Sequence, residues 1–178
     1  MSFEGVYTQP TIQADGFVLR PLRKADAGPI GLYAADERIA KATSSIPHPL
    51  PPGTTEGFIA RSLAEERDED VWVIDPSDDR SEVLGVIGLT RMDREQSEIG
   101  YWVAPQLWGN GLASKAVEAL VQANPQACRT LFGSVFQDNP ASARVLTNAG
   151  FEYIGDAETF SVARDASVST WTYIKKLD

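Results

Sequence analysis

The most regular pattern of hydrophobic and polar positions in the chain lies between Glu98 and Val121. Apolar residues occupy every second position up to Val103, which predicts a strand with two distinct faces. Pro105 ends this pattern, because proline has no backbone N–H to give to a ladder. From Ala113 onward, apolar residues recur at helical spacing and polar ones fall on the other side. The stretch therefore predicts a strand, a turn and an amphipathic helix.

Similar patterns predict the other elements. We expect strands at 17–22, 71–75, 83–89, 97–103 and 130–136, and three closing strands at 152–154, 159–163 and 170–176. The expected helices are one that follows a cap at Asp26, one at 37–42, one from 55 to about 67, one that begins at 113, and one that begins at 140 after a cap at Asp138 or Asn139. Short turns at 76–79 and 93–96 make the middle strands an antiparallel meander, and a strand–helix–strand–helix tail follows. No repeat or linker interrupts the pattern, so we expect one domain, 1–178, of mixed α/β (α+β) class.

The segment from Ser44 to Gly53 holds four prolines, which forbid a helix or a central strand. Two interpretations of this loop stay open, a wall beside a substrate site and a rigid connector. His48, the single histidine, lies between two of these prolines and is expected at the surface rather than in a reaction.

The composition limits the classes of function. At 43% hydrophobic and 23% charged residues the chain is typical of a soluble globular protein, and it has no apolar run long enough to span a membrane. Met1–Gly5 does not resemble a signal peptide, and a single cysteine, Cys128, excludes an internal disulfide or a cysteine metal cluster. We expect a cytoplasmic protein without a metal. A net charge of −9 argues against nucleic acid, would attract a cationic amine, and requires a locally favourable site for any polyanion.

The turn before the helix carries the chemistry. In Gln106-Leu-Trp-Gly109-Asn-Gly111 two glycines can take left-handed angles, so that several N–H groups point at one anion. The positive end of the helix lies just beyond, with Asn110 as a plausible N-cap. This pattern predicts a phosphate-binding turn, although glycines that serve packing alone would look similar. A dinucleotide fingerprint fails because Ser114 stands where a third glycine is needed, and no P-loop lysine is present.

The complete Q-x-x-G-x-G pattern resembles the acetyl-CoA loop of the GNAT acetyltransferases, and the flanking Tyr-Trp-Val-x-Pro-x-x-Trp-Gly-x-Gly-Leu-Ala is similar to the RimJ/RimL-type branch. A second motif, Asn139-x-x-Ser142 followed by Gly150-Phe151, resembles the same family. The resemblance covers about Gly16 to Lys176. It implies a mostly antiparallel central sheet, splayed at the CoA site and flanked by helices. It also implies that the protein transfers the acetyl group of acetyl-CoA to a primary amine, which belongs either to a protein N-terminus or to a small molecule.

The resemblance also assigns residues to the donor. It implies backbone contacts to the acetyl carbonyl near Val103 and to the pyrophosphate along the turn, with Asn139 at the pantetheine or thiol end. Cationic support would come from Arg144 or Lys115. The implied cofactor-binding residues are Val103, Gln106, Leu107, Trp108, Gly109, Asn110, Gly111, Leu112, Ala113, Asn139 and Arg144.

The chemistry favours direct attack by the amine, because one histidine and one cysteine offer no nucleophile–base pair. An alkyl amine is mostly protonated at pH 7, so we expect a carboxylate base, and Glu98 on the central strand is the candidate. Many GNAT enzymes protonate the thiolate with a tyrosine where this chain has Leu146. The RimL-like branch that the chain resembles instead has a serine three residues after the asparagine, which implies Ser142 as the candidate acid. The alternative is a non-catalytic CoA-binding regulatory module. The acceptor stays open, and a homodimer is one option for the assembly.

Overall fold

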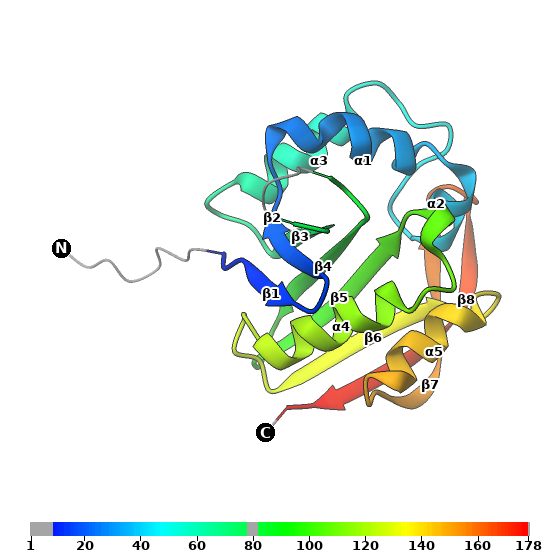
Figure 1. Cartoon of the computed structure of the whole chain (residues 1–178). Coiled ribbons are helices and arrows are strands. Elements are labelled where there is room, and N and C mark those ends of the chain that lie inside the picture. The colour runs from blue at the N-terminus through cyan, green and yellow to red at the C-terminus, as the bar shows by residue number, and fades with distance from the viewer. Residues whose placement is uncertain (1–8, 78–81, 178) are drawn as a thin grey trace.

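The computed structural model describes residues 9–77 and 82–177, in which helices cover both faces of an eight-stranded sheet (Figure 1). The elements are β1 (Ile12–Ala14), β2 (Phe17–Pro21), the 3-10 helix η1 (Lys24–Asp26), α1 (Ala27–Ala34), α2 (Glu37–Ala42), α3 (Thr54–Leu63), β3 (Glu69–Asp75), β4 (Gly85–Met92), β5 (Gln96–Val103), the 3-10 helix η2 (Pro105–Leu107), α4 (Leu112–Ala123), β6 (Thr130–Phe136), α5 (Pro140–Asn148), β7 (Glu152–Ser161) and β8 (Ala166–Lys176). The strand order is β1-β2-β3-β4-β5-β6-β8-β7, and only the β5–β6 pair is parallel. The mixed α/β class with a mostly antiparallel sheet is therefore confirmed.

Several predicted bounds are wrong. Three closing strands are predicted, but the structure has two long ones, β7 and β8. The first two predicted strands are joined in β7, because the chain passes Gly155 through a bulge instead of breaking there. Helix α3 ends at Leu63 and not near Arg67, whose guanidinium already pairs with Asp70 at the start of β3. The three-residue β1 is too short to show a period. Met1–Gly5 and the second half of the turn predicted at 76–79 lie outside the described residues.

Two cores lie on the two faces of the sheet. Alternate residues of each strand divide between them: Trp72 and Ile87 join the cluster under α4 and α5, whereas Val71 and Val86 join the cluster under α1 and α3. Figure 1 shows these two pairs of helices on opposite sides of the sheet. Within the described residues, no helix combines the length and the apolar character needed to cross a membrane.

A buried ion network joins the first strands to α1. The sequence predicts Asp26 as a helix cap, but its carboxylate makes no capping bond to α1 and accepts from Arg20 at 2.8 and 2.9 Å. Arg20 also donates to Asp75 at 2.7 Å, and all three side chains are buried. Asp26 binds Arg20 rather than the helix because a buried guanidinium without carboxylate partners is costly. The uncapped helix end costs less, since water can solvate it.

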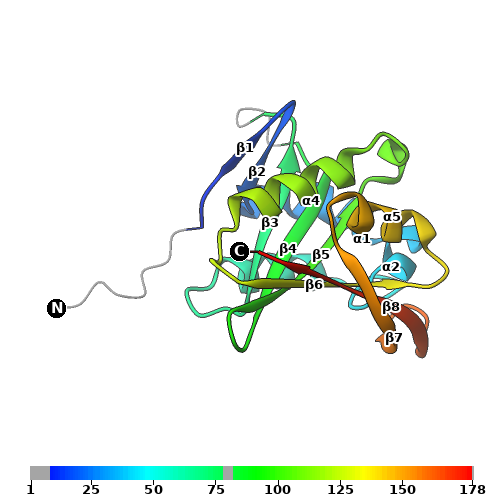
Figure 2. The same cartoon turned by 90° about the horizontal axis from the view of Figure 1, so that it is seen from below.

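The parallel ladder between β5 and β6 is short. It joins Gln96–Ile99 to Thr130–Gly133, after which β5 continues beside β4 and β6 beside β8 (Figure 2). A β-carbon on Gly133 would lie 2.8 Å from Cδ1 of Leu146, so the glycine lets α5 pack against β6 where the strands separate. We call this separation the fork.

We expect Gly133→Ala to lower the free energy of unfolding by about 1–3 kcal/mol, because Leu146 is enclosed and must shift to make room for a methyl group. Gly100→Ala is the matched control on β5, since a β-carbon there meets no atom within 4 Å. Its effect should stay within about 0.5 kcal/mol. Urea unfolding measures both variants, and equal effects would contradict the packing account of the fork.

Candidate functional site

Two hollows meet at the fork. The larger, about 700 Å³, runs along the glycine turn, the start of α5 and the end of α2, and we call it the glycine-loop groove. The smaller, about 400 Å³, lies between α2, α3 and the β3–β5 face of the sheet, and we call it the sheet pocket. Their shared wall consists of Ala42, Tyr101, Trp102, Asn139 and Ser142. A ligand in the groove can therefore present one end to a ligand in the pocket.

The glycine turn has the predicted geometry. Gly109 and Gly111 have φ values of 83° and 76°, in the left-handed region, and a β-carbon on either would enter open space. Gly111 is itself the N-cap of α4, so the prediction of Asn110 as cap is wrong. A glycine at this position suits the sharp entry to the helix, where a side chain would be strained. The turn thus exposes backbone N–H groups at the positive end of a twelve-residue helix.

The structure brings most of the predicted donor residues to the groove. The lining includes Val103, Leu107, Trp108, Gly109, Gly111, Leu112, Ala113, Asn139 and Arg144. Gln106 and Asn110 are not part of it. The Nε2 of Gln106 donates to the Tyr33 hydroxyl at 2.8 Å, so this side chain ties the turn to α1.

Cationic side chains gather at the groove although the chain is acidic overall. The cations that line it are Arg38, Lys41, Arg144 and Arg164, whereas Lys115, predicted together with Arg144, does not line it. Three of them are paired with carboxylates: Arg38 with Asp36, Lys41 with Glu37, and Arg164 with Asp138. The Arg38 guanidinium lies 5.7 Å from the centre of the Trp108 ring. Arg164 donates to the carbonyl of Lys41 at 2.8 Å. Sequence reasoning missed Arg38, Lys41 and Arg164, because α2 and the β7–β8 turn approach the glycine turn only in the folded chain.

A tyrosine that the sequence analysis did not single out stands at the fork. The Tyr101 hydroxyl lies 2.9 Å from Oγ of Ser142 and donates to the carbonyl of the same residue at 3.0 Å. Burial raises the pKa of Tyr101 to about 12, although the hydrogen bond to Ser142 acts in the opposite direction and lowers it. Asn139 caps α5, as predicted, by accepting from the Ser142 N–H at 3.3 Å. The serine hydroxyl is therefore not occupied in capping the helix.

The floor of the sheet pocket is one face of three strands. Glu69, Thr90 and Glu98 stand directly opposite one another on β3, β4 and β5. Gly88 and Gly100 pair with each other two residues further along the same face, and because they have no side chains they leave room above the sheet. Partial enclosure by the pocket raises the pKa of Glu98, although its side chain still meets solvent there.

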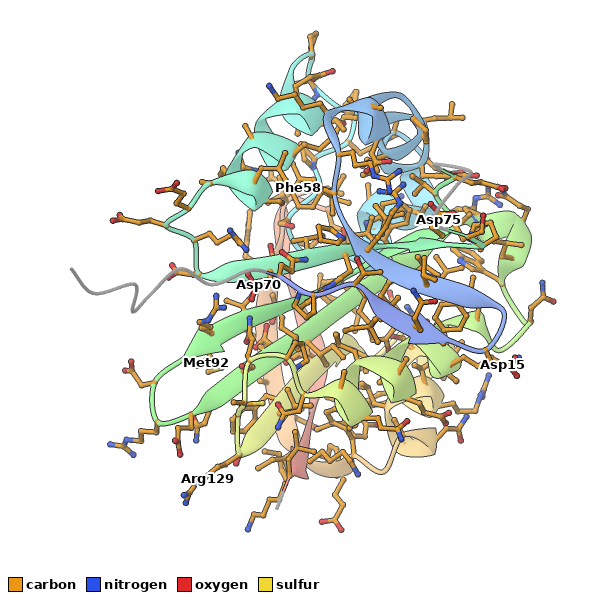
Figure 3. All side chains as sticks on the ribbon, turned by 60° about the vertical axis from the view of Figure 1, so that its left-hand side comes forward. Asp15, Phe58, Asp70, Asp75, Met92 and Arg129 are labelled. Atoms are coloured by element: carbon orange, nitrogen blue, oxygen red, sulfur yellow. The ribbon has the colours of Figure 1, made fainter. Side chains whose placement is uncertain are left out.

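The proline-rich loop contributes little to the pocket. Ser44 and Ser45 line the pocket, while the carbonyl of Ser44 accepts from the Val162 N–H at 3.0 Å. His48 is exposed and lines neither hollow. The wall interpretation thus fits only the first residues of the loop, and the rest connects α2 to α3. Phe58, on the sheet-facing side of α3, closes the pocket from above (Figure 3).

Comparison with known proteins gives consistent matches. A family model described as acetyltransferase (GNAT) domain matches residues 17–152. YoaA, an uncharacterized N-acetyltransferase of Bacillus subtilis, is 28% identical over 82% of this chain and 85% of its own length. The ribosomal-protein-serine acetyltransferase of Escherichia coli is 30% identical over 54% of this chain and 56% of its own. The solved structure of RimL, a ribosomal L7/L12 α-N-protein acetyltransferase in complex with coenzyme A, shares the fold with a TM-score of 0.79 at 18% identity, covering 95% and 99% of the two chains.

We expect Gly111→Val to weaken binding of coenzyme A, the ligand that the sequence resemblance implies, by at least about tenfold, or ~1.4 kcal/mol. A branched side chain is strained at a φ of 76° and would project into the open space of the turn. Gly16→Val is the matched control, because Gly16 has a φ of 87°, equally open surroundings and no place in either hollow. Calorimetry should show full affinity in this control, and full affinity in both variants would contradict the phosphate role of the turn.

Proposed function

The chain belongs to the GNAT acetyltransferase family, and on that premise we propose that it transfers the acetyl group of acetyl-CoA directly to a primary amine in the sheet pocket. The observation that carries this proposal is the meeting of groove and pocket at Tyr101, Trp102 and Ser142. A thioester held in the groove would present its carbonyl carbon to an amine held in the pocket, so the two reactants would gain the advantage of proximity. The acceptor would be a protein N-terminus or a small molecule, and the single buried cysteine fits a cytoplasmic setting.

The donor would lie along the glycine-loop groove. The resemblance assigned the pyrophosphate to N–H groups from Leu107 to Ala113, but those of Leu107 and Trp108 donate to the carbonyls of Ala104 and Pro105 at 2.9 and 3.1 Å. The N–H groups from Gly109 to Ala113, at the N-terminus of α4, would therefore hold the pyrophosphate, with Arg144 adding positive charge. The N–H of Ala104 donates to the carbonyl of Leu84, just before β4, so by strand alternation the N–H of Val103 faces the fork. That N–H would stabilise the negative charge that develops on the acetyl oxygen. Asn139 would contact the pantetheine or thiol end.

The amine must lose a proton before it attacks. Glu98 would accept this proton, directly or through one water molecule, because it lies in the pocket beside the fork. Partial enclosure raises its pKa and so makes it a stronger base than an exposed glutamate. An alkyl amine with a pKa near that of lysine, about 10.4, needs such a base at neutral pH.

The departing thiolate would meet the Tyr101–Ser142 pair. Proton transfer from a phenol with a pKa of about 12 to a thiolate whose thiol has a pKa of ~8.5 is uphill by roughly 3.5 units, or ~5 kcal/mol. Tyr101 therefore acts as a hydrogen-bond donor rather than as the final acid. The single phenolic proton of Tyr101 can go to the carbonyl or to Oγ of Ser142. When Oγ accepts it, the serine hydroxyl would donate a hydrogen bond to the sulfur. Because an aliphatic hydroxyl is a weaker acid than a phenol, the thiolate would leave hydrogen-bonded and take its proton from solvent.

An acceptor screen that follows thiol release from acetyl-CoA tests the whole proposal, with Gly111→Val as the inactive control. The alternative, a CoA-binding regulatory module, predicts bound coenzyme without turnover on any amine. The presence of both Glu98 and the Tyr101–Ser142 pair at the pocket favours the enzyme, since a binding module needs neither.

We expect Glu98→Gln to lower kcat by on the order of 10²- to 10⁴-fold while the affinity for coenzyme A stays the same. In the wild type, the acidic limb of the kcat/KM profile should lie above the ordinary glutamate pKa of about 4.3, because Glu98 must be ionised and its pKa is raised. Stopped assays across the pH range measure both effects. Normal turnover in the variant would assign the base to another group.

Glu98→Gln should not lower stability. A carboxyl whose pKa is higher in the folded than in the unfolded state binds more protons when folded, so its contribution to stability falls as pH rises between the two pKa values. The variant lacks this contribution, and its melting temperature at neutral pH should equal or exceed that of the wild type. A lower melting temperature would mean that the charge supports the fold.

We expect Tyr101→Phe and Ser142→Ala each to lower kcat by roughly tenfold, the scale of one hydrogen bond. The double variant should lose no more than either single one, because the two hydroxyls act as a unit. Ser142→Thr should restore part of the activity. Thermal stability of Ser142→Ala should stay unchanged, since Asn139 supplies the helix cap. Multiplicative losses would show that the two groups act separately.

A further inference from the structure

The sheet pocket contains a second carboxylate that the reaction above does not use. Glu69 on β3 pairs with Thr90 on β4, which pairs with Glu98 on β5, so the two acids stand two strands apart on one face. Two strand spacings place their α-carbons roughly 10 Å apart. Both residues line the pocket, and each extends its side chain over the same trough.

The position of Glu69 is set from several directions. A β-carbon on Gly88 would lie 3.0 Å from Oε2 of Glu69, so the carboxylate leans over β4 toward the trough. Thr90 hydrogen-bonds to it. On the opposite face, the neighbouring Asp70 is held by Arg67 and Arg91 at 2.9 and 2.7 Å, which prevents the end of β3 from rotating. Glu69 therefore faces the pocket, while its side chain remains open to solvent.

The two carboxylates lack a cationic partner within the pocket. Among the described lining residues there is no lysine, arginine or histidine. Arg61 on α3 attracts Glu69 from a distance, but the two form no ion pair within 4 Å, and the guanidinium folds back along its own helix near Gly57. Partial desolvation raises the pKa of both acids, and the charge of Glu98 further raises the pKa of Glu69. A ligand with one positive charge would leave the pocket with an unbalanced negative charge.

A separate observation shows that the pocket is built for a polar ligand. Thr170 on β8 lines the pocket and is 2% exposed. Its Oγ1 has no hydrogen-bond partner among the described residues. Thr170 pairs with Phe136, which also lines the pocket, so its side chain stands on the same face of the sheet as the carboxylates, with the hydroxyl enclosed at the wall of the pocket. A buried hydroxyl without a partner is costly, and an acceptor N–H would satisfy it.

We propose that the acceptor is a compact dicationic amine, with its reacting nitrogen at Glu98, its second ammonium at Glu69 and a hydrogen bond to Thr170. This inference rests on the proposed acetyl transfer and specifies its substrate class. The carboxylates balance both charges of such a molecule, and the glycine floor leaves room for its methylene chain. A free amino acid would bring a carboxylate against two acids, so the pocket rejects it.

Three probes of matched length test the proposal: 1,4-diaminobutane, 1-aminobutane and 4-aminobutanoate. The wild type should acetylate the diamine with the highest kcat/KM and the aminobutanoate with the lowest. Glu69→Gln should lower kcat/KM for the diamine by roughly 10- to 100-fold, mainly through KM, and leave the value for 1-aminobutane nearly unchanged. Glu69→Asp, which keeps the charge, should retain part of the preference. Glu118→Gln, on the exposed side of α4 and outside both hollows, is the charge-matched control.

Thr170→Val provides an independent measurement. If the hydroxyl has no ligand, its removal is neutral or stabilising and leaves KM unchanged. We expect the melting temperature to stay level or rise while KM for the diamine rises several-fold. Unchanged KM in this variant would overturn the assignment of Thr170.

The outcomes separate the inference from the proposed function. Two results would overturn the dicationic acceptor and leave acetyl transfer intact. One is a kcat/KM for 1-aminobutane or for a peptide N-terminus that equals or exceeds the value for the diamine. The other is an equal loss for all probes in Glu69→Gln. Coenzyme binding without turnover on any amine would overturn both.

Discussion

The early end of the β5–β6 ladder is the constraint on which the rest of the site depends. After Ile99 and Gly133 each strand follows its other neighbour, and the facing edge of β5 has no strand beside it. Both hollows open at this point, one on each side of the sheet plane. The packing of Leu146 over Gly133 sets α5 against β6, so that its capped N-terminus and Ser142 stand at the opening. A continuous ladder would have filled the site with backbone hydrogen bonds.

The two hollows differ in charge, and this difference fits two unlike reactants. Arginine and lysine side chains from α2, α5 and the β7–β8 turn line the groove, whereas the described lining of the pocket has carboxylates and no cation. In a chain with a net charge of −9, Arg38, Lys41 and Arg164 are each paired with a carboxylate, so Arg144 and the N–H groups of the glycine turn would carry most of the attraction for a polyanion. The proposed acetyl donor and the proposed cationic acceptor would thus be drawn to opposite sides of one fork. Tyr101 and Ser142 stand between them.

Local patterns predicted the fold to the extent that its elements are set by neighbours in sequence. The strand 130–136 matches β6 residue by residue, and Asn139 caps α5 through its own first turn. The errors arise where a tertiary partner outweighs a local preference. Asp26 stands at the N-cap of α1 as predicted, but its carboxylate binds Arg20 instead of the helix N–H groups. Strand β7 runs through Gly155 because β8 supplies a continuous partner. The resemblance to the family was equally local, since it rested on two short motifs around Gly109 and Asn139, and the family model matches residues 17–152.

The sequence by itself therefore determined the glycine turn and its place between a strand and a helix, because left-handed angles and helix ends depend on a few adjacent residues. It also pointed to Glu98 as a carboxylate on the central strand. Only the tertiary structure decided that Glu69 stands opposite it, that Tyr101 reaches Ser142, and that Arg164 meets the groove. Strand register and helix packing bring these groups together across 29 or more positions of the chain, and no local period encodes such a distance.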